Sequence, residues 1–163
     1  AKKYGEDMYV IKAAIDANEK QKRKMVEKII DKMEGIEGKH IAILGLSFKP
    51  DTDDMREAPS LDIIRGLVEA GAKIQAYCPE GMKEARWRLE DCENSITYCA
   101  DEYSVVNEAD AVVLMTEWNQ FRGMNLKNVR ERMKDNFYFD LRNVYVKDSN
   151  VRKIFKYYPI GQE

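Results

Sequence analysis

Two basic residues of this chain stand where a phosphorylated ligand could be bound. Lys49 follows the apolar segment 41–46, and Arg142 follows the apolar segment 137–139. If both segments are parallel strands of one sheet, their carboxyl ends lie at the same edge. A lysine is a compact point charge and an arginine is a planar fork, and together they suit a diphosphate or ribose oxygens. The pattern indicates an anion site built from side chains.

The same two side chains could instead serve only the fold. Lys49 could pair with Asp51 or Asp53, and Arg142 could pair with Asp140, because these acids lie close by in the sequence. Exposed ion pairs of this kind are common and contribute little to stability. Both interpretations stay open at the level of the sequence.

A second polar cluster contains Asp51, Asp53, Asp54 and Arg56 and precedes a predicted helix. The cluster could be purely structural, because the helix dipole favours acids near a helix N-terminus. Alternatively, paired acids after the first strand and Thr116 after the fourth are typical of a phospho-accepting receiver domain. The fifth strand, however, is closed by an arginine where receivers carry a lysine, which counts against this alternative.

No nucleophile with a neighbouring base can be recognised, so we assign no catalytic residue and no metal ligand. His40 is the only histidine, and Cys78, Cys92 and Cys99 lack the spacing of a metal site. Cys78 closes a predicted strand with no histidine close in sequence, which indicates a packed thiol. Trp118 could either stack on a ligand or cover the edge of the core.

The glycine-rich fingerprint of dinucleotide-binding domains, G-x-G-x-x-G, is absent after the first predicted strand. Only Gly45 remains of it. Without the second and third glycines, the backbone cannot approach a pyrophosphate closely. The chain is therefore predicted not to bind NAD in the usual way by itself.

The elements that must position these residues alternate between strands and helices from residue 39 onward. The strands are apolar runs, as expected where helices cover both faces of a sheet. Five βα repeats of this kind predict an α/β fold, a doubly wound, Rossmann-like parallel sheet of about five or six strands. The predicted strands are 40–48, 73–79, 95–100, 110–116 and 136–143, and the predicted helices are 60–71, 81–92, 101–109 and 125–134.

A long helix is predicted before the sheet, over residues 7–34. Apolar residues recur in it at steps of three or four, and Gly35 and Gly38 end the pattern. Such a helix is about 42 Å long, more than a small domain can cover. It could lie along its own domain with a frayed start, or connect to another domain or subunit. We divide the chain into a connecting and dimerisation segment, 1–38, and a ligand-binding domain, 39–163.

The composition limits the classes of partner and the compartment. Of the 163 residues, 44% are hydrophobic and 34% are charged, and the formal net charge is −2. That balance argues against a nucleic acid or a membrane surface held by bulk charge. No apolar run reaches the roughly 20 residues of a membrane helix, and the N-terminus lacks the apolar core of a secretion signal. An odd number of cysteines then favours a cytoplasmic protein with reduced thiols.

The stretch GLSFKPDTDDMREAPS, followed by VVLMTEW and YFDLRN, resembles the C-terminal, UDP-binding domain of the UDP-glucose/GDP-mannose dehydrogenase family. That domain carries the pattern G-L-[AS]-F-K-x-x-T-x-D-x-R-x-[AS]-x-S, and residues 39–161 follow its order of elements. Within the family, the match is most like the enzymes that act on UDP-glucose. The resemblance implies oxidation of the C6 alcohol of a nucleotide sugar to the acid, in two steps with two NAD.

The resemblance also implies roles for individual residues. Phe48, Lys49 and Arg142 match positions that contact the UDP-sugar, and Arg56 matches one near the NAD diphosphate. NAD and the catalytic cysteine belong mainly to the family's N-terminal domain, so this chain is expected to be inactive alone. Cys78 stands where the family usually has an aspartate.

The expected partners are a UDP-sugar, the N-terminal NAD-binding domain, and a second copy of the chain bound through the 7–34 helix. Two alternatives stay open. The chain could be an assembly module whose main role is dimerisation and whose nucleotide pocket is vestigial. The substrate could also be a UDP-N-acetyl-hexosamine or GDP-mannose, because the enzymes for these sugars share the same motifs.

Overall fold

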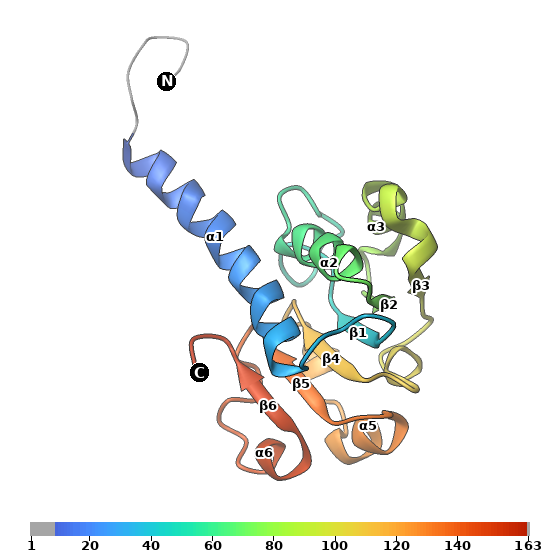
Figure 1. The fold of residues 1–163 in the computed structure, drawn as a ribbon. Coiled ribbons are helices and arrows are strands. Elements are labelled where there is room, and N and C mark those ends of the chain that lie inside the picture. Colours follow the sequence, from blue (N-terminus) through green and yellow to red (C-terminus); the bar gives the residue numbers. More distant parts are fainter. Residues whose placement is uncertain (1–8, 163) are drawn as a thin grey trace.

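The chain forms one six-stranded sheet in which all neighbouring strands are parallel. The computed structural model describes residues 9–162. The strand order is β3-β2-β1-β4-β5-β6 (Figure 1). The bounds are His40–Leu44 for β1, Lys73–Tyr77 for β2, Ile96–Tyr98 for β3, Ala111–Leu114 for β4, Phe137–Asp140 for β5 and Lys156–Pro159 for β6. The doubly wound parallel sheet predicted from the sequence is confirmed.

The last strand, β6, is absent from the strands that we predict individually. Its side chains alternate between exposed or half-buried and buried positions, so no apolar run marks it. Its packing on β5 is aromatic instead. Tyr158 stacks on Phe139 and Phe137, with ring centroids 5.1 Å and 6.4 Å apart. Such ring pairs contribute beyond the apolar area that they bury, and they help to hold β6 on the sheet.

The predicted helices are found except in two places, and two single-turn helices, α4 (Asn119–Arg122) and α6 (Val151–Ile154), are additional to the prediction. Residues 101–109 form only a 3-10 turn: Asp101 Oδ1 caps its start by accepting hydrogen bonds from the amides of Tyr103 and Ser104, both at 2.8 Å, but the backbone is already extended at Asn107. The helix predicted over 81–92 ends early and continues as a 3-10 segment. The helices are α1 (Tyr9–Lys32), α2 (Pro59–Glu69), α3 (Met82–Arg88), α4 (Asn119–Arg122), α5 (Leu126–Arg132) and α6 (Val151–Ile154), with 3-10 turns η2 (Glu90–Ser95) and η3 (Ser104–Val106).

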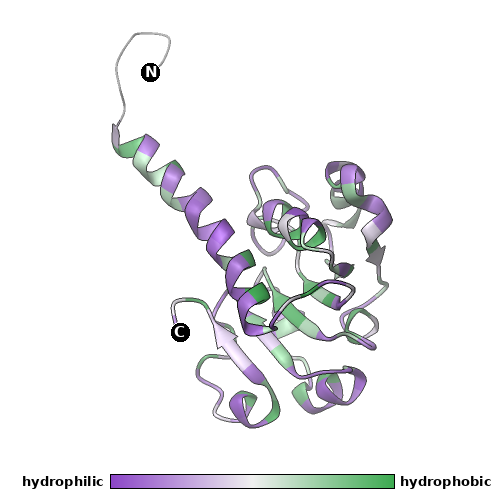
Figure 2. Ribbon diagram, in the orientation of Figure 1, coloured by the Kyte–Doolittle hydropathy of each residue, from purple (hydrophilic) through white to green (hydrophobic). Residues whose placement is uncertain are grey.

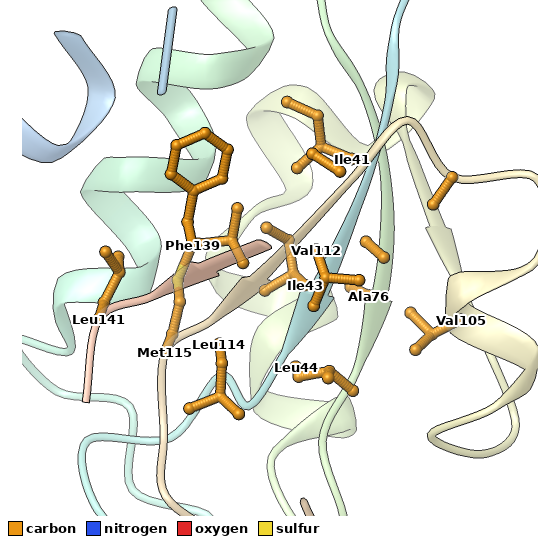
Figure 3. Close-up of a cluster of buried hydrophobic side chains, with 14 of the residues drawn as sticks. Ile41, Ile43, Leu44, Ala76, Val105, Val112, Leu114, Met115, Phe139 and Leu141 are labelled. Atoms are coloured by element: carbon orange, nitrogen blue, oxygen red, sulfur yellow. The ribbon is translucent and has the colours of Figure 1, made fainter. Parts of the chain in front are cut away.

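The core lies on both faces of the central strands. Every residue of β4 and β5 is buried, and so is β1 after His40. Figure 3 shows Ile43, Val112 and Phe139 of these three strands in one apolar cluster. Right-handed crossovers place α2 and α3 on one face of a parallel sheet and the helices after β4 on the other. Burial on both faces explains why the strands read as continuous apolar runs.

The strand order reverses between β1 and β4, which lie side by side in register from Ile41 and Ala111 onward. In an open α/β sheet, the crevice outside the carboxyl ends of the strands at such a switch point is the usual place for a ligand. Here three segments meet at that edge: residues 45–58 after β1, 115–118 after β4 and 141–143 after β5.

The helix α1 extends well beyond the sheet (Figure 1). Its inner half contributes Met25 and Ile29 to the core. Its outer turns leave Val10 and Ile11 83% and 49% exposed. Figure 2 shows apolar stretches among the outer turns and a hydrophilic middle of the helix. Of the predicted range 7–34, residues 7 and 8 lie outside the described part of the chain.

Polar contacts fasten the inner half of α1 to the rest of the domain. Lys28 Nζ donates to the carbonyl oxygens of Pro159, at 2.9 Å, and Gln162, at 2.6 Å. Burial lowers the pKa of Lys28 from its usual value. Lys22 forms an ion pair with Asp62 of α2. Within residues 9–162, no helix has the length and apolar character that a membrane span requires.

Candidate functional site

The loops after β1 and β4 touch at Gly45. This glycine has a φ of +88°, and a Cβ added to it would lie 2.6 Å from the Cβ of Thr116. Thr116 is fully buried and its hydroxyl donates to the carbonyl oxygen of Ser47 at 2.7 Å. Gly45 therefore serves close packing of two loops. The burial of Thr116 also argues against the receiver alternative, which needs this hydroxyl at the surface.

The loop after β1 is closed by its own hydrogen bonds. The Ser47 hydroxyl donates to the carbonyl oxygen of Lys49 at 2.9 Å, and the amide of Phe48 donates to the carbonyl oxygen of Asp54 at 2.9 Å. This geometry turns Phe48 and Lys49 outward. Phe48 is 50% exposed, and Lys49 is exposed and makes no side-chain hydrogen bond or ion pair within residues 9–162. The alternative that Lys49 pairs with Asp51 or Asp53 is therefore wrong.

Arg142 bridges the loops after β1 and β4. Its Nε donates to the carbonyl oxygen of Met115 at 2.8 Å and lies 3.2 Å from a carboxylate oxygen of Glu117. Its Nη2 donates to the carbonyl oxygen of Phe48 at 3.2 Å. Nη1 makes no hydrogen bond within the described part of the chain. The guanidinium is thus fixed across the switch point, directly beside the residue that precedes Lys49.

Asp140 does not pair with the Arg142 side chain, as one alternative had it, but it positions the Arg142 backbone. Its fully buried carboxylate accepts hydrogen bonds from the amides of Arg142, at 3.1 Å, and Tyr145, at 2.8 Å. It also accepts one from the Tyr157 hydroxyl of β6 at 2.6 Å. Burial and this hydrogen bond raise the pKa of Tyr157 above its ordinary value. Asp140 could be recognised in the sequence as an acid that closes a strand. Its hydrogen bond to Tyr157 could not, because that residue belongs to another strand.

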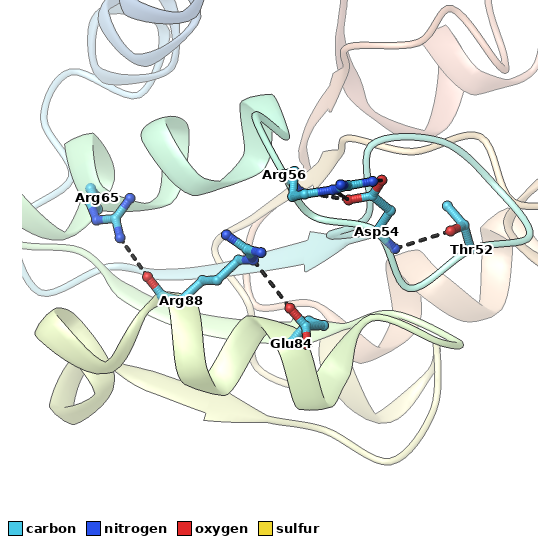
Figure 4. A network of polar contacts seen from close by, with 6 residues as sticks. All are labelled: Thr52, Asp54, Arg56, Arg65, Glu84 and Arg88. Atoms are coloured by element: carbon cyan, nitrogen blue, oxygen red, sulfur yellow. Dashed lines mark hydrogen bonds and ion pairs between the residues drawn. The ribbon is translucent and has the colours of Figure 1, made fainter.

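Arg56 lies farther along the same loop and is 77% exposed. Its Nε and Nη2 donate to the two oxygens of Asp54, at 3.0 Å and 2.8 Å (Figure 4). This pairing lowers the pKa of the Asp54 carboxyl well below its usual range. The structure therefore holds Arg56 at the ligand edge, apart from the bridge that Arg142 forms.

A groove of about 520 Å³ runs between α1 and this edge of the sheet. Phe48 and Arg142 lie in its wall, and so do Ile15, Asn18 and Gln21 of α1. We call it the α1 groove. Sequence reasoning missed the contribution of α1 to the site, because periodicity shows which face of a helix is apolar but not what that face meets.

The remaining candidates from the sequence are structural. Cys78 is fully buried, with its Sγ 3.7 Å from the Ser47 hydroxyl, so the prediction of a packed thiol is confirmed. Trp118 is only 6% exposed and covers the core edge without offering a face for stacking. Among residues 9–162, no group of three or more His, Cys, Asp or Glu side chains could hold a metal ion.

The strand order and the loops at the switch point define the class of protein, a Rossmann-like α/β domain. Residues 42–147 match the family described as "UDP-glucose/GDP-mannose dehydrogenase family, UDP binding domain". The chain belongs to this family, as the resemblance of its motifs implied.

Curated relatives support the same assignment. The chain is 41% identical to the UDP-glucose 6-dehydrogenase of Rhizobium meliloti (strain 1021) over 155 residues, which are 94% of this chain and 34% of the relative. It is 35% identical to UDP-glucose 6-dehydrogenase TuaD of Bacillus subtilis (strain 168) over 162 residues, 99% of this chain and 34% of the relative. The chain thus spans about a third of the length of these relatives.

A solved structure shows the same fold. A UDP-glucose dehydrogenase from the hyperthermophilic archaeon Pyrobaculum islandicum superimposes with a TM-score of 0.70 at 32% sequence identity, over 84% of this chain and 33% of that one. A UDP-D-ManNAc dehydrogenase from Pyrococcus horikoshii gives a TM-score of 0.69 at 22% identity. At that identity, the second likeness concerns the fold alone.

Proposed function

We propose that this chain binds the UDP part of a nucleotide sugar through Phe48, Lys49 and Arg142. One observation carries the proposal: Arg142 is fixed against the carbonyl oxygen of Phe48, and the residue after Phe48 is an exposed lysine that has no partner within residues 9–162. Two cations on neighbouring chain segments at a switch point suit a diphosphate. Family membership gives the ligand class, and the carbonyl contact gives the reason why the two cations belong together.

Titration of the chain with UDP, followed by calorimetry, tests this proposal. Lys49→Ala removes one charge-assisted contact, so we expect the dissociation constant to rise by about tenfold. Lys153→Ala is the matched control, because Lys153 is also exposed but lies in α6, which leads into the opposite end of β6. A wild-type chain without any UDP-dependent heat at millimolar ligand would contradict the proposal, and so would equal losses in the two variants.

We further propose that the whole protein is an NAD-dependent, cytoplasmic UDP-glucose 6-dehydrogenase that forms UDP-glucuronate. The relatives that support this substrate are UDP-glucose 6-dehydrogenases at 35% and 41% identity, whereas the likeness to the UDP-D-ManNAc enzyme is only 22%. A UDP-N-acetyl-hexosamine or GDP-mannose is the alternative substrate. The proposed boundary between connecting helix and UDP-binding domain stays at residues 38 and 39.

The residues present fit NAD only in part. The position where a glycine fingerprint would begin is taken up by packing of Gly45 on Thr116, so the backbone offers no pyrophosphate cradle. Arg56 can supply one cation to the NAD diphosphate from this side, with Asp54 fixing its fork. When bound, NAD would accept the hydride from the sugar carbon. The chain itself contributes binding and orientation, and we propose that it is inactive without an NAD-binding domain.

The outer turns of α1 support a proposal of dimerisation through this helix. Val10 and Ile11 are large, exposed apolar residues on a helix that the domain does not cover. We expect the chain to sediment as a dimer at micromolar concentration and Ile11→Asp to sediment as a monomer. Lys20→Asp, about half a helical turn away around the axis, should stay dimeric. A wild-type monomer would refute the proposal. A wild-type dimer that does not bind UDP would favour a pure assembly module.

A further inference from the structure

We propose that Asp54 is a positioning residue that joins the diphosphate-binding segment and Arg56 in one hydrogen-bonded unit. The inference rests on the proposed function, because it concerns the same anion site. The backbone carbonyl oxygen of Asp54 accepts a hydrogen bond from the Phe48 amide, and its carboxylate accepts hydrogen bonds from the Arg56 side chain. A change at this one residue should therefore affect both parts of the site.

The backbone half of the unit fixes Phe48 from both sides. The Phe48 amide donates to the carbonyl oxygen of Asp54 at 2.9 Å, and the Phe48 carbonyl oxygen accepts from Arg142 Nη2 at 3.2 Å. Arg142, Phe48 and Asp54 thus form a continuous chain of hydrogen bonds. Lys49 follows directly, so its position depends on this chain.

The side-chain half of the unit fixes Arg56. Asp54 Oδ1 accepts from the Arg56 amide at 2.9 Å and from Arg56 Nε at 3.0 Å, while Oδ2 accepts from Nη2 at 2.8 Å. The Asp54 amide in turn donates to the Thr52 hydroxyl at 3.1 Å (Figure 4). The amide, the carbonyl and both carboxylate oxygens of Asp54 are therefore all used.

The backbone on either side of this unit has a conformation that is energetically unfavourable for residues other than glycine. Asp51 and Glu57, on either side of the segment, have φ of +58° and +55°. Residues other than glycine adopt this region at a cost and keep it where neighbouring contacts determine it. An exposed aspartate–arginine pair contributes little to stability by itself, so its contribution here is to geometry.

The sign of the effect on UDP binding distinguishes positioning from simple charge. Removing a carboxylate beside an anion site should tighten UDP binding if only charge matters, because a repulsion is lost. If Asp54 positions Phe48 and Lys49, its removal should weaken UDP binding instead. Asp53 is the matched control, since it is exposed, lies next to Asp54 and makes no side-chain hydrogen bond or ion pair within residues 9–162.

The test compares Asp54→Ala, Asp54→Asn and Asp53→Ala in the whole chain. The asparagine keeps an oxygen that can accept the Arg56 amide, but it loses the ion pair. We expect Asp54→Ala to weaken UDP binding by about tenfold, Asp54→Asn to stay within about twofold of the wild type, and Asp53→Ala to bind as well as the wild type or better. Weakening in Asp53→Ala, or tighter binding in Asp54→Ala, would overturn the proposal.

Hydrogen exchange of amide and guanidinium groups, measured by NMR without ligand, tests the positioning role of Asp54 independently of UDP binding. The Phe48 amide should exchange at least about tenfold faster in Asp54→Ala and almost unchanged in Asp54→Asn. The Arg56 Nε–H should exchange faster in both. If the wild type fails to bind UDP while this pattern appears, the proposed function fails and the positioning role stands. Unchanged Phe48 exchange in a folded Asp54→Ala refutes the positioning role even where UDP binds.

Discussion

Replacing Arg142 by methionine is expected to weaken binding of UDP to the chain by about 100-fold, equivalent to about 2.7 kcal/mol. Hydrogen bonds between charged groups contribute about 1.5–3 kcal/mol each, and a guanidinium can make two to a diphosphate. Methionine keeps much of the stem and removes the fork. Because Arg142 also donates to the carbonyl oxygens of Met115 and Phe48, the variant should place Lys49 less well too. Calorimetric titration measures the change.

Two further variants show whether the fork or only the charge matters. Arg142→Lys keeps the charge but cannot reach both carbonyl oxygens and the ligand, so we expect about a tenfold loss. Arg130→Met removes a half-buried arginine that, like Arg142, donates to a backbone carbonyl oxygen, here that of Met133 at 3.2 Å, and it should leave UDP binding unchanged. If Arg142→Met binds UDP as the wild type does, this residue has no place in the site.

Replacing Gly45 by alanine is expected to lower the free energy of unfolding by about 3 kcal/mol or more. The φ of +88° costs an alanine about 1–2 kcal/mol. Its Cβ would also stand 2.6 Å from the Cβ and 2.9 Å from the amide nitrogen of Thr116, and such overpacking typically costs about 1–3 kcal/mol more. Urea unfolding, monitored by circular dichroism, gives the change.

Gly38→Ala separates the two causes of this loss. Gly38 has a φ of +70°, but a Cβ there would meet nothing within 4 Å. It should therefore lose only about 1 kcal/mol, the cost of the backbone conformation. Equal losses in Gly38→Ala and Gly45→Ala would mean that the contact between the loops after β1 and β4 does not matter.

The architecture could be predicted where one physical rule dominates the local sequence. The runs at β1, β4 and β5 are apolar because both faces of these strands are buried, and each is followed by polar residues at the ligand edge. The motif from Gly45 to Ser60 fixed the family. The exposure of Lys49 and the burial of Cys78 also agree with the sequence-based interpretation.

Features that depend on distant partners could not be predicted. β6 is held by Tyr158 against two rings of β5, and no local pattern reveals that pairing. The site role of Asp140 depends on the hydroxyl of Tyr157, which lies 17 residues away. Residues 101–109 look helical by composition, and Asp101 caps the first amides as it would those of a helix, but the backbone becomes extended at Asn107 after a single turn.

Lys28 binds the C-terminal tail, residues 159–162, only through main-chain atoms, the carbonyl oxygens of Pro159 and Gln162. The direction in which α1 leaves the sheet is therefore insensitive to which side chains the tail carries, provided that its path is kept. A peptidase that trimmed the tail back past Pro159 would, in contrast, remove both acceptors of Lys28 and leave α1 held by Met25 and Ile29 in the core and by the Lys22–Asp62 ion pair. The outer turns of α1, a helix about 36 Å long from end to end, would then be oriented less firmly, although no residue near them had changed.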